Sequence, residues 1–129
     1  MTDDDIKKII KDTVSATVLQ LKAAGLLRDD TMQAYQKTEC LLFQYPTLKN
    51  VNEPYARQVV AEIDACLVAA KNDPYVGVIE LYYFKGLKNA ACAKKLCCDE
   101  RTCRRNRRKL VEQFSVRLAS DEFIRELLL

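Results

Sequence analysis

Hydrophobic residues recur at intervals of three and four along most of the chain, which is the period of amphipathic α-helices. The segment "DDDIKKIIKDTVSATVLQLKAAG" has this spacing from Ile6 to Leu21, begins with aspartates and ends at Gly25. A second helix is predicted from Asp30 to Tyr45, because Pro46 then removes a backbone donor that a further turn needs. The first third of the chain therefore predicts two helices.

Two more helices are predicted, and each has a proline in its first turn. Pro54 opens the third helix, whose apolar residues lie on one side until it ends near Asn72. Asp73 as N-cap and Pro74 at the first helical position open a fourth helix, which continues to about Phe84. Its aromatic residues stand among valine, isoleucine and leucine, so they are expected in the core: Tyr75, Tyr82, Tyr83 and Phe84.

Beyond Gly86 the pattern changes to a short alanine-rich helix, a tight break and a longer helix. The break falls at Cys97 and Cys98 and leads to Asp99, whose carboxylate can cap the N–H groups of a helix over 99–118. Two helices that cross steeply with so short a link need small side chains where they touch. Ala93 is expected at that contact, with Cys92, Leu96, Cys98 and Cys103 around it. This order predicts a helix-turn-helix.

The segment "RTCRRNRRKL", residues 101–110, is strongly basic and still has an apolar period. Cys103 faces inward with Leu110 and Val111, which leaves four arginines outside: Arg101, Arg104, Arg105 and Arg108. Basic runs are usually solvated faces. Between Lys85 and Leu110, however, ten basic residues and two acids give a local charge of +8, which favours a counter-charge such as phosphate.

Composition and charge support an all-α chain with two functions. Three glycines and three prolines in 129 residues are too few for the turns of an all-β fold. Residues 1–84 have a net charge of −3 and residues 85–129 a net charge of +6. We therefore expect an acidic helical module for interaction or dimerisation at 1–72, and a helix-turn-helix DNA-binding domain at 73–129.

Several other classes of protein receive little support from the sequence. No apolar run approaches the roughly 20 residues of a membrane span, and the N-terminus lacks signal-peptide features, so a cytoplasmic protein is expected. The chain has no histidine and no glycine-rich phosphate loop, which argues against an enzyme. Four cysteines could hold zinc, but their spacing fits poorly: Cys92, Cys97, Cys98 and Cys103. Reduced thiols without a cofactor are preferred, with cysteine acting as a small hydrophobic residue at three core positions.

The stretch from Gly86 to Phe114 resembles region 4 of sigma-70-type factors. The matching positions are Gly86, Ala93, Leu96, Cys98, Asp99, Thr102 and Cys103, followed by "RRNRRKLV". Nearly the whole chain is similar to the small sigma-like and autolysin-regulator (ArpU-like) proteins of phages and prophages of Gram-positive bacteria. The segments that carry this similarity are "LKAAGLL", "QKTECLLFQYPTLK", "DPYVGVIELYYFKG", "TCRRNRRKLV" and "LASDEFIREL".

The resemblance implies a sequence-specific duplex DNA-binding regulator, with phage late genes as its targets. The helix over 99–118 would read the major groove through Arg101, Arg104, Arg105 and Arg108, and Thr102, Lys94 and Lys95 would meet phosphates. Lys88 completes the candidate DNA-binding residues. RNA polymerase and a second copy of the chain are further candidate partners. The alternative is a packaging or structural interaction protein, similar to small terminase subunits, with weak or no sequence-specific DNA binding.

Two residues depart from the region 4 pattern. Cys97 stands where the turn usually has a glycine, which argues against a positive φ at this position. Arg107 stands at a position that is usually apolar. We expect its stem to lie on the core while its charged end reaches outward, and we leave it off the reading face.

Overall fold

The computed structural model describes residues 33–128, and these residues are helical without any β-strand. The elements are α3 (Ala34–Leu48), α4 (Pro54–Ala69), α5 (Gly77–Ile79), the π-helix η1 (Glu80–Phe84), α6 (Asn89–Lys95), α7 (Glu100–Leu118) and α8 (Asp121–Leu128). The all-α prediction is therefore confirmed for the described part of the chain. The helix expected from Ile6 to Leu21 lies outside the described residues.

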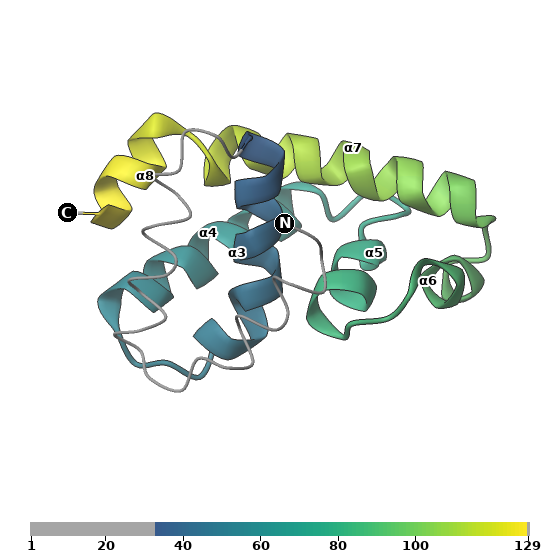
Figure 1. Cartoon of the computed structure of the whole chain (residues 1–129), viewed down its shortest axis with the longest axis horizontal. Helices are drawn as coiled ribbons and strands as arrows, with labels where there is room; N and C mark the ends of the chain where they lie inside the picture. The colour runs from purple at the N-terminus through teal and green to yellow at the C-terminus, as the bar shows by residue number, and fades with distance from the viewer. Residues whose placement is uncertain (1–32, 129) are drawn as a thin grey trace.

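The long helix α7 is the element against which most of the others pack. It extends along one edge of the molecule, with α6 near its first turns and α8 near its last turns (Figure 1). It contacts α3, α4, α5, α6 and α8. Its buried side chains are Cys103, Leu110, Val111, Phe114 and Leu118. These residues join one hydrophobic core that runs continuously across the predicted boundary between residues 72 and 73; the functional division at that boundary stays a prediction.

Helix α3 differs from the expected second helix at both ends. It begins at Ala34 rather than Asp30, because Gln33 is extended and its N–H donates to the side chain of Gln36 in a capping box. It also continues through Pro46 to Leu48. Leu48 is almost fully buried, and its burial outweighs the one backbone hydrogen bond that proline removes. The prediction that Pro46 ends the helix is therefore wrong.

The predicted fourth helix is not a regular α-helix. Asp73 accepts a hydrogen bond from the N–H of Tyr75 at 2.8 Å, but residues 74–76 form turns and α5 covers only Gly77–Ile79. The chain then widens into η1, in which the N–H of Lys85 donates to the carbonyl of Glu80, five residues back.

The predicted third helix corresponds to α4, which ends at Ala69, three residues before the predicted end at Asn72.

The aromatic residues of η1 belong to the core, as predicted for Tyr82 and Tyr83. Tyr83 packs edge-on against Phe43 of α3, with ring centroids 4.8 Å apart. Its hydroxyl donates to the carboxylate of Glu39 at 2.6 Å, and burial together with this carboxylate raises the pKa of Tyr83 far above its usual value. Phe84 is only partly buried and stacks on Tyr45 at 4.3 Å. These contacts attach η1 to α3.

Helices α6 and α7 follow the predicted order of short helix, turn and long helix. Cys92, Ala93 and Cys103 are buried where α6 and α7 pack together. Leu96 and Cys98 pack against the same core and are partly buried. The small side chains predicted at this contact are therefore present there.

The turn between α6 and α7 has a positive φ at a residue other than glycine. Cys97 has φ 57°, whereas its identity argued against such a conformation. Residues on both sides are held by the core, and the N–H of Cys98 donates to the carbonyl of Ala93 at 3.0 Å. The packing of the two helices thus imposes a left-handed conformation that an L-residue adopts only with strain.

Asp99 caps α7 as predicted. Its Oδ1 accepts a hydrogen bond from the N–H of Thr102 at 2.6 Å. Hydrogen bonds from the Thr102 backbone and side chain, followed by the charges of Arg105 and Arg101, lower the pKa of Asp99. The ionised carboxylate is the form that favours the start of this helix.

Replacing Cys97 by glycine should stabilise the protein by about 0.5 to 1 kcal/mol in urea unfolding. Glycine removes a left-handed strain of roughly 1–2 kcal/mol, which exceeds its own loss of roughly 0.5–1 kcal/mol in backbone entropy. Cys97→Ala is the matched control, because it removes the thiol but keeps the Cβ. An equal stabilisation by Cys97→Ala would show that the thiol, rather than the backbone, is unfavourable.

Replacing Asp99 by asparagine should remove one part of the acid sensitivity of the fold. The folded pKa of Asp99 is lowered, so its stabilising effect is complete above the unfolded pKa near 4 and is lost as pH falls through the folded value. Asparagine caps a helix about as well without titrating. We expect Asp99→Asn and the unchanged protein to have similar melting temperatures at pH 6 and to diverge as pH falls to 2, where only the unchanged protein loses its ionised cap; Asp99→Ala should melt lower than both at pH 6. Parallel pH profiles would contradict this assignment.

Candidate nucleic-acid interface

The four arginines predicted to read DNA lie on α7 and are all exposed. They are Arg101, Arg104, Arg105 and Arg108, and we call them the arginine stripe. Their positions recur at three- and four-residue intervals on the side opposite the buried Cys103 and Leu110. The core thus forces these guanidinium groups toward solvent over the first three turns of α7.

The other candidate residues flank this stripe in different ways. Lys94 and Lys95 occupy the last turn of α6, and Lys88 is its N-cap residue; all three are exposed. Thr102 is half-buried, and both its N–H and its side chain hydrogen-bond to Asp99. Its carbonyl accepts from Asn106 Nδ2 at 2.8 Å. Thr102 therefore acts first as part of the cap that begins α7.

Arg107 does not reach outward as expected, because its guanidinium itself lies against other elements. Its Cζ lies 3.7 Å from the ring centroid of Tyr82, and its Nη1 donates to the side-chain oxygen of Asn89 at 2.5 Å. It thereby ties α7 to η1 and to the first residue of α6. This position agrees with the choice to leave Arg107 off the reading face. The prediction that its charged end reaches outward is wrong.

The cysteines behave as small apolar residues at the contact between α6 and α7. Burial raises the pKa of the Cys103 thiol to about 11, and the neighbouring thiols of Cys98 and Cys92 act in the same direction. Burial also raises the pKa of Cys92. These three thiols do approach one another, as the sequence predicted. Within residues 33–128, no group of three or more potential ligand side chains is arranged to hold a metal ion.

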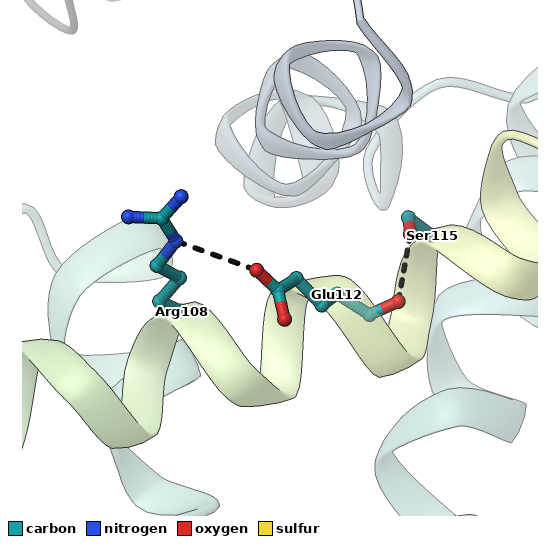
Figure 2. A network of polar contacts seen from close by, with 3 residues as sticks. All are labelled: Arg108, Glu112 and Ser115. Atoms are coloured by element: carbon teal, nitrogen blue, oxygen red, sulfur yellow. Dashed lines mark hydrogen bonds and ion pairs between the residues drawn. The ribbon is translucent and has the colours of Figure 1, made fainter.

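Two exposed residues at the end of the stripe were not among the candidates. Lys109 adds a further cation to the exposed side of α7, and Glu112 brings a carboxylate to it. The Arg108 Nε donates to Glu112 Oε1 at 3.3 Å (Figure 2). The four-residue spacing of arginine and glutamate is visible in the sequence and could have indicated this pair.

The last turn of α7 is attached to α4 by an ion pair. Arg117 Nε lies 2.7 Å from Glu62 Oε1 of α4. Among residues 33–128, exposed basic residues that form no ion pair are numerous on the first half of α7 and on α6. None of the helices within residues 33–128 has the length and apolar character to cross a membrane.

In comparisons with known proteins, no family model, no curated protein and no solved structure matches this chain.

Proposed function

We propose that this protein is a sequence-specific double-stranded DNA-binding regulator of the sigma-70 region 4 type, acting on phage late genes. The observation that carries the proposal is the arginine stripe on α7, exposed along one side of a helix whose opposite side is buried. A rigid helix of this kind suits the major groove, which admits one α-helix and presents acceptor atoms to arginine.

The arrangement of α6 supports the same proposal. It packs on the first half of α7 through Cys92 and Ala93 and exposes Lys94 and Lys95. In a helix-turn-helix the first helix crosses the DNA backbone, where lysines neutralise phosphates without reading bases. The two helices thus divide positioning and reading between them.

Binding to duplex DNA should be strongly dependent on salt. Five to eight of the ten basic residues between Lys85 and Leu110 are expected to meet phosphate, so the slope of log affinity against log salt should be roughly −4 to −7. Fluorescence anisotropy on a labelled duplex at several salt concentrations measures this slope. A slope near zero on every duplex would favour the packaging or structural interaction protein instead.

Substitutions on α7 and α6 should affect specific and random DNA differently. Arg104→Ala or Arg105→Ala should weaken binding to a selected operator by about 1 to 3 kcal/mol and affect random duplex much less. Lys94→Ala and Lys95→Ala should weaken both duplexes about equally, since phosphate contacts carry no sequence information. The measurement is a titration of each variant at one fixed salt concentration, with folding checked by circular dichroism. The same loss for all four variants on both duplexes would remove the assignment of reading to α7.

A further inference from the structure

Arg108 is the one member of the arginine stripe with an acidic residue four positions further along α7. The corresponding positions for Arg101, Arg104 and Arg105 are occupied by Arg105, Arg108 and Lys109. Glu100 stands four residues before Arg104, but among the described residues it is Arg108 alone of the stripe that forms an ion pair, with Glu112. Figure 2 shows the two side chains extending side by side from the exposed surface of α7.

The pair engages one particular nitrogen of Arg108. Nε donates to Glu112 Oε1 at 3.3 Å, and the guanidinium extends beyond the contact with its two Nη groups directed away from the carboxylate (Figure 2). The side chains of Arg108 and Glu112 are 76% and 59% exposed, so the Nη groups are accessible to a ligand. An arginine held at Nε presents its remaining donors end-on, as a fork with fixed orientation.

Guanine offers the acceptors that match this fork. Its O6 and N7 lie side by side in the major groove, and the bidentate contact from arginine is the commonest base-specific contact in protein–DNA complexes. Adenine presents a donor in place of the O6 acceptor, so an end-on arginine distinguishes the two purines. We propose that Glu112 is a positioning residue that presents Arg108 to a guanine in duplex DNA. This inference rests on the proposed function.

The charge of Glu112 contributes a second effect. A carboxylate on the DNA-facing side of α7 repels phosphate, which weakens binding in any register where Arg108 meets the backbone instead of a base. In water the exposed pair is weak and screened. When DNA excludes water from the interface, the interaction between the two charges becomes stronger, and it then favours the register in which Arg108 is held toward the groove.

Selection from a random duplex library tests the proposal, using the unchanged full chain and the variants Glu112→Ala, Glu112→Gln, Arg108→Lys and Arg108→Ala. Glu122→Ala is the matched control, because it removes one exposed carboxylate on α8, away from the stripe. The unchanged protein should enrich sites with one nearly invariant G·C pair. Replacing that pair by A·T should weaken its binding about tenfold.

The variants should separate positioning from general electrostatics. Glu112→Ala should lose most of the tenfold discrimination while binding random duplex more tightly, and Glu112→Gln should retain part of it, because its amide oxygen still accepts from Nε. Arg108→Lys should also lose discrimination, and Glu122→Ala should keep it. Replacing the guanine by 7-deazaguanine, which lacks the N7 acceptor, should weaken DNA binding by the unchanged protein and leave DNA binding by Arg108→Ala unaffected.

The possible outcomes distinguish this inference from the proposed function. If a guanine is enriched and the discrimination survives in Glu112→Ala, or if Glu122→Ala loses as much, the positioning role of Glu112 is overturned while DNA reading stands. If 7-deazaguanine weakens DNA binding by Arg108→Ala as much as binding by the unchanged protein, Arg108 does not contact the guanine. If no duplex is enriched by the unchanged protein, the proposed function and this inference both fail.

Discussion

Burial of one side of α7 is the constraint on which the rest of the structure depends. Cys103, Leu110, Val111, Phe114 and Leu118 are nearly inaccessible to solvent, and they are reached from α3, α4, α6 and α8. Burying this apolar surface is the dominant favourable contribution to folding. Because the same helix carries the arginine stripe, its burial also fixes which way the arginines point. Stability and the proposed reading surface therefore depend on the same contacts.

Polar contacts between side chains help to set the angles between the elements around α7. Arg107 joins α7 to Tyr82 of η1 and to Asn89 of α6, while Arg117 pairs with Glu62 of α4. Such contacts are directional, whereas apolar burial is not. Arg107 thereby holds the short helix α6 in register with the first turns of α7. Arg107 lies between stripe residues in the sequence, but it stabilises the fold and takes no part in the proposed contact with DNA.

Local chemistry was sufficient to predict the elements closest to the candidate site. The cap at Asp99, the alanines and cysteines of the tight contact, and the inward period of Cys103 and Leu110 all depend on residues a few positions apart, so the sequence predicts α7 and its exposed arginines. The same applies to the proline that opens α4. These features need only the geometry of one helix and its ends.

The sequence by itself therefore determined the all-α class, the cap of α7 and the exposed side of its arginines. Only the tertiary structure decided the continuation of α3 past Pro46, the π-helical turn at Tyr82 and Tyr83, the left-handed φ of Cys97 and the inward guanidinium of Arg107. In each of these cases packing between elements outweighs a local preference of about 1 to 3 kcal/mol, whether the elements are adjacent in the chain, as at Cys97, or distant in it. Local patterns contain no information on such contacts, because the partners are brought together only when the core forms.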